Sequence, residues 1–279
     1  MGHAIVLNSA SKANTTGGTF ADNLSANSGD SLTVANFPSG SARILEMWGI
    51  DSDSVAELQV IYTRPDSSHD QQHGIRFEIP SVALGGAATN AAFNMLPGYG
   101  QIPLSPSDTP TFGVTSTAAD DVLVSWITEY DNLPGVQGNF ATWQQVQNLH
   151  KSTFGFFVGP TASGTPGAYG TNRALNADDD RFHAGSWYAI LGITVQTQVT
   201  TVGFIGPDWG GQRIGCPAGS LDLRSSTWFV DQAVKWNKAM IPCFQANNKA
   251  NTFMMVADGE ASTQPKVDVF CYELTGAPF

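Results

Sequence analysis

Charged residues are scarce in this sequence, and basic residues are scarcer than acidic ones. Asp, Glu, Lys and Arg make up 13% of the 279 residues, with 24 acidic and 13 basic side chains and a net charge of −11. An average protein carries about 25% charged residues. Phosphate backbones are bound by clustered Lys and Arg, and the sequence has no such cluster. We therefore expect no direct nucleic-acid binding.

Cysteine and long apolar runs are also lacking. The three cysteines, Cys216, Cys243 and Cys271, are widely spaced and fit neither a disulfide framework nor a zinc site. We expect reduced, buried thiols in a chain made in a cytosol. No apolar run approaches the length of a membrane-spanning helix, and the N-terminal segment lacks the basic start of a signal peptide.

Catalytic motifs are missing as well. The sequence contains no Gly-x-Ser-x-Gly elbow, P-loop or dinucleotide-binding fingerprint, and its five histidines form no His/Ser/Asp pattern. We therefore expect a protein that is not an enzyme and that holds no cofactor. A structural calcium ion is the one exception that the sequence allows.

The sequence is rich in turn residues, with 29 Gly and 15 Pro, and in short alternating runs. In DVLVSWITEY (121–130) the even positions are apolar or aromatic except for Thr128, while Ser125 and Glu129 fall among the odd ones. This period of two predicts a half-buried strand. Similar runs lie at 31–37, 42–50, 55–62, 194–206, 252–258 and 266–274. Helical signal is limited to three short segments, at 81–96, 141–151 and 220–236.

Segments of the first half recur in the same order in the second half. In MWGID (47–51) and ILGIT (190–194), Gly-Ile follows a large apolar residue. In YTRPD (62–66) and FIGPD (204–208), an aromatic residue stands three positions before Pro-Asp. The other matched pairs are 21–32 with 171–182, 74–80 with 211–217, 101–104 with 240–243, 111–121 with 252–262, and 124–130 with 269–274, which aligns Glu129 with Glu273. The ordered matches predict an internal duplication.

Each copy contains seven or eight short strands and one helix-bearing segment. Eight strands in two packed sheets form a jelly roll. The predicted fold is therefore all-β, with two tandem eight-stranded jelly-roll β-sandwiches and short helical excursions. The predicted boundaries are an N-terminal arm at 1–19, a first jelly roll at 20–134, a linker segment at 135–168 and a second jelly roll at 169–279. Trp126 and Phe270 are expected in the cores of their sandwiches.

With this duplicated pattern the chain resembles the double jelly-roll major capsid proteins of tailless icosahedral, membrane-containing phages, in their compact form. The resemblance implies a structural viral protein whose homotrimers form pseudo-hexagonal capsomers that tile an icosahedral shell. It implies self-association into trimers, contact with neighbouring capsomers and with penton or minor capsid proteins, and an arm reaching toward neighbours or an internal membrane. The implied location is the virion capsid, after synthesis in the host cytoplasm.

Two other functions compete with this one. Seven Trp and sixteen Phe could form the sugar-stacking face of a tandem β-sandwich glycan-binding or attachment protein. A bicupin-like metalloenzyme would need metal ligands, and His69 and His73 with Glu78 lie close in sequence. Separately, Asp178, Asp179 and Asp180 form an acidic turn that could hold a structural Ca²⁺.

Overall fold

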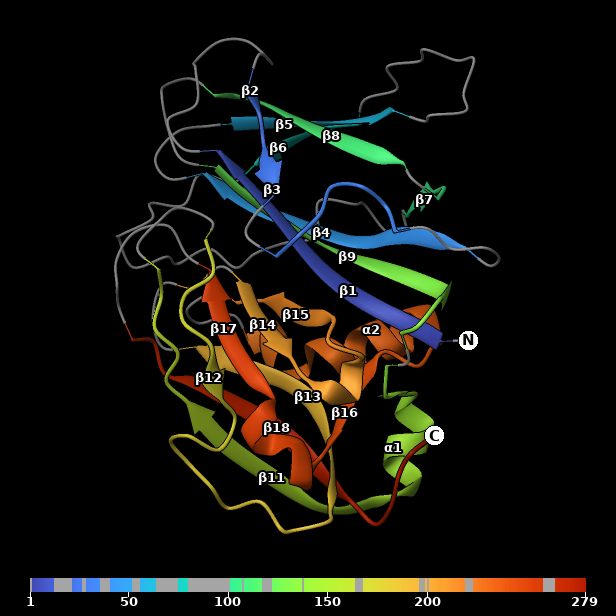
Figure 1. Cartoon of the computed structure of the whole chain (residues 1–279), viewed down its shortest axis with the longest axis vertical. Coiled ribbons are helices and arrows are strands. Elements are labelled where there is room, and N and C mark those ends of the chain that lie inside the picture. The colour runs from blue at the N-terminus through green and yellow to red at the C-terminus, as the bar shows by residue number, and fades with distance from the viewer. Residues whose placement is uncertain are drawn as a thin grey trace.

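The structure is a computed structural model, and β-strands make up most of it (Figure 1). The described residues are 2–12, 22–26, 29–35, 41–51, 56–63, 75–79, 101–106, 108–116, 122–136, 138–163, 168–195, 199, 201–218, 223–257 and 264–279. The strands form four antiparallel sheets, two in each half of the chain. We call residues from β1 to β9 the first half and residues from β10 onward the second half. The expectation of a mostly β protein is confirmed.

The first half contains a five-stranded sheet in the order β3-β1-β9-β4-β7 and a four-stranded sheet in the order β2-β8-β5-β6. Their strands are β1 (Gly2–Lys12), β2 (Asp22–Asn23), β3 (Ser25–Ala26), β4 (Ala42–Asp51), β5 (Ala56–Thr63), β6 (Ile75–Ile79), β7 (Ile102–Leu104), β8 (Thr109–Ser116) and β9 (Val122–Leu133).

The second half contains a five-stranded sheet in the order β10-β16-β13-β18-β11 and a four-stranded sheet in the order β12-β17-β14-β15. Their strands are β10 (Phe140–Ala141), β11 (His150–Val158), β12 (Arg173–Ala174), β13 (Trp187–Val195), β14 (Thr201–Ile205), β15 (Arg213–Pro217), β16 (Ile241–Gln245), β17 (Phe253–Ala257) and β18 (Val267–Leu274).

Both halves arrange their strands in the same order. With β3 and β10 set aside, because neither has a counterpart in the other half, the described strands of each half can be numbered along the chain from one to eight. The larger sheet then reads 1-8-3-6 and the smaller sheet 2-7-4-5 in both halves. Each of the seven matched sequence pairs places its two segments on strands with the same number.

The predicted N-terminal arm at 1–19 is wrong for residues 2–12. These residues form β1, which lies beside β9 in the first five-stranded sheet and pairs with it from Gly2 to Lys12. Apolar side chains of β1 are buried in the structure: Ala4, Leu7 and Ala10 are at most 1% exposed. A first domain starting at residue 20 therefore omits one of the sheet's longest strands.

The predicted linker at 135–168 is also wrong over most of its length. It contains β11, which pairs with β18 from His150 to Val158 and is an edge strand of the second five-stranded sheet. It also contains the helix α1 (Trp143–Asn148), within the predicted helical segment 141–151. Thr142 and Gln145 cap this helix reciprocally: Thr142 Oγ1 accepts the Gln145 N–H at 3.2 Å, and Gln145 Oε1 accepts the Thr142 N–H at 2.8 Å.

A second helix lies within the predicted segment 220–236. The short 3-10 helix η2 (Leu223–Thr227) leads into α2 (Trp228–Trp236), which ends at Asn237 in a left-handed conformation. Two further 3-10 turns are η1 (Pro207–Trp209), between β14 and β15, and η3 (Ala246–Asn251), between β16 and β17. The predicted helix at 81–96 lies outside the described residues. No helix in the described ranges is long and apolar enough to cross a membrane.

Strand β9 is buried on both faces, although its sequence pattern predicts one solvated face. Val122, Val124 and Trp126 face the first half's own core, where the Trp126 ring lies 4.6 Å from that of Phe112. The odd positions are equally buried: Ser125 and Glu129 have no exposed surface. The second half of the chain covers this outer face, meaning the sheet face turned away from the four-stranded sheet of the same half.

Strand β18 keeps the expected alternation, which moves one predicted core residue to the surface. Val267, Val269 and Cys271 are buried, whereas Phe270 on the other face is 38% exposed. The prediction that Phe270 packs in a core is therefore wrong, and the one for Trp126 is confirmed. Val124 and Val269 both face the core of their own half and are therefore equivalent positions. Counted from these two residues, the predicted alignment of Glu129 with Glu273 is wrong by one position. In a strand, such a shift exchanges the faces.

Candidate functional site at the seam between the two halves

The outer face of β1, β9 and β4 packs against β14, β15 and α2 of the second half. We call this contact the seam, and it crosses the middle of the molecule (Figure 1). Its apolar residues from the first half join the hydrophobic core of the second half in one continuous cluster; they are Ile5, Leu7, Leu45, Trp48 and Ile127. A shared core of this kind makes the two halves one packed body.

A glycine allows β1 to approach β15 closely. A Cβ atom at Gly215 would lie 2.5 Å from Leu7 Cδ2 and 2.2 Å from the Val202 carbonyl oxygen, closer than real Cβ atoms come to their neighbours. The seam at this point therefore requires a residue without a side chain.

A chain of hydroxyl groups crosses the seam. Ser9 Oγ lies 2.9 Å from Ser125 Oγ, and Ser125 Oγ lies 2.9 Å from Thr201 Oγ1 in the second half. Thr201 Oγ1 also accepts the indole N–H of Trp48 at 3.1 Å, and Ser9 Oγ lies 2.7 Å from the Tyr169 hydroxyl. These buried polar groups thus satisfy one another, which removes the cost of burying them unpaired.

Asp30 and Arg213 form an ion pair beside this hydroxyl chain. The Asp30 carboxylate is 2% exposed and also accepts the Ser9 backbone N–H at 3.0 Å. The Arg213 guanidinium lies over the Tyr169 ring, 4.0 Å from its centroid. Burial raises the pKa of Asp30 to about 7, although Arg213 and the Ser9 N–H act in the opposite direction.

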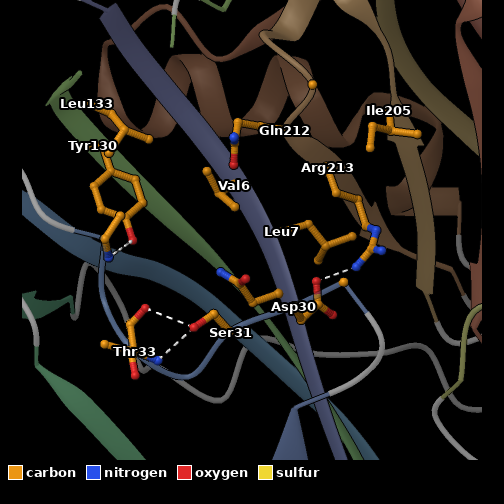
Figure 2. Close-up of a pocket in the computed structure, with 14 residues that line it drawn as sticks. Val6, Leu7, Asp30, Ser31, Thr33, Tyr130, Leu133, Ile205, Gln212 and Arg213 are labelled. Carbon is orange, nitrogen blue, oxygen red and sulfur yellow. Dashed lines mark hydrogen bonds and ion pairs between the residues drawn. The ribbon is translucent and has the colours of Figure 1, made fainter. Parts of the chain in front are cut away.

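A cavity of about 250 Å³ opens beside this ion pair, between the two halves (Figure 2). Its walls come from β1, the segment 29–35, the end of β9, and the turn between β14 and β15. Val6, Leu133 and Ile205 supply apolar wall, and Gln212 and Tyr130 supply polar atoms. The Tyr130 hydroxyl accepts the Ala35 backbone N–H at 3.4 Å. Of the cavity's polar groups, Arg213 and Asp30 are paired with each other across the seam.

A second electrostatic contact joins the halves at Glu129. Lys238, in the loop after α2, donates to both carboxylate oxygens of Glu129 at 2.7 and 2.8 Å. Arg43 Nε lies 2.9 Å from Glu129, and Asp131 contacts both cations. His3 donates from Nε2 to the Ala239 carbonyl at 2.9 Å, and burial lowers the pKa of His3.

A third contact pairs Lys235 of α2 with Glu46 of β4. In all three contacts the carboxylate belongs to the first half and the cation to the second: Asp30 with Arg213, Glu46 with Lys235, and Glu129 with Lys238. The seam is thus complementary in charge as well as in shape, which fixes the register of one half on the other.

The predicted calcium ligands do not converge. Asp178 pairs with Arg173 and accepts the Gly159 N–H, Asp179 pairs with Arg181, and Asp180 pairs with Lys249. Each carboxylate already has its own cation, so the turn has no shared cluster of free oxygens. A calcium ion here stays a prediction without support from this geometry.

Within the described ranges, one group of side chains has the spacing of a metal site: His3, Glu129 and Asp131. Lys238 and Arg43 already neutralise its two carboxylates, and a bound cation would be repelled by both. The group is better explained as an ion-pair cluster of the seam. His69 and His73 lie outside the described residues, and nothing is described of the Glu78 side chain.

The seam was not predicted from the sequence. Its residues are separated by large sequence distances, 183 positions for Asp30 and Arg213 and 109 for Glu129 and Lys238. A partial signal was available in β9, where Ser125 and Glu129 alternate with Leu123 and Ile127, because a solvated strand face seldom carries two large aliphatic side chains.

No family model matches the chain, and no curated protein matches it. Among solved structures it is weakly similar to viral capsid proteins. A chain of the Macrobrachium rosenbergii nodavirus structure is 10% identical, with 98% of each chain covered and a TM-score of 0.25. The major capsid protein P2 of bacteriophage PM2 is 8% identical, with 98% of each chain covered and a TM-score of 0.23.

The PBSX exported protein XepA is also weakly similar, at 13% identity, with 96% of this chain and 86% of that chain covered and a TM-score of 0.19. TM-scores this low do not establish a shared fold. The function proposed below therefore rests on the strand order and on the seam.

Proposed function

We propose that the chain is a structural viral capsid protein made of two tandem jelly rolls. The observation that carries the proposal is the strand order, 1-8-3-6 in the larger sheet and 2-7-4-5 in the smaller one, repeated in both halves. An eight-stranded sandwich in two sheets with its first and last strands adjacent is the jelly-roll arrangement, common in capsid, lectin and cupin domains. A tandem pair of such blocks suits a shell subunit, since three chains supply six similar blocks around one axis.

The seam supports this function over catalysis. A shell subunit must transmit contacts between its neighbours without its two blocks moving apart. The continuous apolar cluster, the hydroxyl chain and three complementary ion pairs hold them together. The described carboxylates that meet there are paired with cations rather than left to act on a substrate. We accordingly propose a protein without catalytic activity.

The proposed partners are further copies of the chain in a homotrimer, neighbouring capsomers, and penton or minor capsid proteins at the shell's vertices. The proposed location is the virion capsid, where an internal membrane would be a further contact. The acidic balance, −11 over the whole chain, argues against direct packing on a nucleic-acid genome.

The test is the mass of the purified protein in solution, measured by light scattering after size exclusion. A homotrimer has three times the chain mass of 29.6 kDa, and a shell or sheet is larger still. Either result supports the proposal. A monomer at 29.6 kDa contradicts it. Glycan arrays and metal analysis would then test the glycan-binding and bicupin-like alternatives.

A further inference from the structure

We infer that the outer face of β11 and β18 is a docking surface for a second copy of this chain, through that copy's four-stranded sheet β2-β8-β5-β6. The inference deepens the proposed function and rests on it, because it takes the two halves as equivalent blocks. It identifies the contact that would link one subunit to the next.

The first half provides the template for this contact. The outer face of its five-stranded sheet is covered by the second half's four-stranded sheet, and β9 is buried there from Val122 to Tyr130. At its centre, Ser9 of β1 lies opposite Ser125 of β9, and Ser125 contacts Thr201 of β14.

The equivalent face of the second half is open over β11 and β18. Val124 of β9 and Val269 of β18 both face the core of their own half, so the residues that follow them, Ser125 and Phe270, are equivalent. Their cross-strand partners, Ser9 on β1 and Gly155 on β11, are equivalent in turn. Gly155 is exposed, and so is Thr153 two residues earlier. Phe270 is one of three large apolar side chains classed as exposed among the described residues.

The chain's own helical segments cover only the margins of this face. On β13, the backbone of η2 lies so close to Gly192 that a Cβ there would be 2.2 Å from the Ser225 carbonyl oxygen. At the other margin the Trp143 ring of α1 lies 5.9 Å from that of Tyr272. Between these margins lies the strip centred on Phe270, which pairs with Gly192 on β13 and with Gly155 on β11 and keeps 38% of its surface exposed.

The position of the two surfaces favours a second copy as the occupant. The four-stranded sheet of the first half lies at the end of the molecule opposite β11 (Figure 1). A contact between unlike surfaces at opposite ends is heterologous, and such contacts close into rings when the rotation per copy allows it.

The experiment replaces the centre of the strip by a charge, as Phe270→Asp, and measures the mass in solution by light scattering. The matched control is Val234→Asp on α2, which changes a more exposed apolar residue (59% against 38%) outside the strip. We expect a trimer for the wild type and for Val234→Asp, and a monomer for Phe270→Asp. Circular dichroism of each variant reports whether it folds.

Thr153→Arg provides a second, independent variant, because Thr153 is exposed on β11 opposite Tyr272. If Phe270→Asp fails to fold, dissociation of the folded Thr153→Arg variant still supports the inference. A trimer that persists in every folded strip variant overturns it while leaving the proposed function intact. A wild type that is itself a monomer overturns the proposed function.

Discussion

Lys238, in the loop after α2, donates to both carboxylate oxygens of Glu129 on β9, at 2.7 and 2.8 Å. The Glu129 side chain has no exposed surface, so it depends on protein groups for all of its stabilisation. The contact ties the second half of the chain to the central strand of the first and forms one of three similar charge pairs along the seam.

Removing this cation should destabilise the whole protein. Lys238→Met leaves the buried Glu129 carboxylate with Arg43 as its remaining close cation, and we expect a loss of about 3 kcal/mol in the free energy of unfolding. The control Lys266→Met breaks the surface pair with Asp268 and should cost at most about 1 kcal/mol. Urea denaturation followed by circular dichroism measures both. Equal losses in the two variants would contradict the role assigned to Lys238.

The close approach of β1 to β15 should be sensitive to a single methyl group. In Gly215→Ala the new Cβ meets Leu7 and the Val202 carbonyl oxygen, and we expect a loss of about 1–3 kcal/mol. Gly276→Ala is the control, because a Cβ there has no neighbour within 4 Å. Thermal melting compares the variants, and an unchanged melting temperature in Gly215→Ala would mean that the seam is looser than described.

The Asp30 carboxyl should make stability depend on pH in an unusual direction. Burial raises its pKa from the ordinary 3.8 to about 7, so between these values the folded state retains a proton that the unfolded state releases. The free energy of unfolding therefore falls as pH rises through this window and levels off above it. We expect the free energy of unfolding of the wild type to fall by up to about 1.4 kcal/mol per pH unit in this window because of Asp30. The Asp30→Asn variant should lack this contribution to the slope. Urea titrations at pH 4, 5, 6 and 7 measure the slope, and parallel curves for variant and wild type would refute the assignment.

Trp126 and Phe270 should differ sharply when each is truncated to Ala. Trp126 is 2% exposed and its ring packs against that of Phe112, so its loss should cost about 3–5 kcal/mol. Phe270 faces outward, so Phe270→Ala should cost much less in a monomeric state. Chemical denaturation at low protein concentration measures both variants. A large loss for Phe270→Ala under those conditions would place its side chain in a core after all.

Several features follow from local sequence because they depend on short-range chemistry. The period of two in 121–130 and 266–274 predicts strands β9 and β18, since alternate residues point to opposite faces whatever lies beyond. The segments 141–151 and 220–236 contain α1 and α2, and the three cysteines are buried. The order of matched segments also agrees with the order of strands in the sheets.

Other features were decided by tertiary structure alone. A period of two separates the faces of a strand without saying what covers each face, so Ser125 and Glu129 of β9 and Phe270 of β18 could not be placed correctly. The strand at Gly2–Lys12 has a mixed sequence and becomes a strand because β9 pairs with it. The pairs Asp30 with Arg213 and Glu129 with Lys238 exist because two separately wound halves meet. Their packing buries these charges together, and contacts across such distances leave no periodic trace in the sequence.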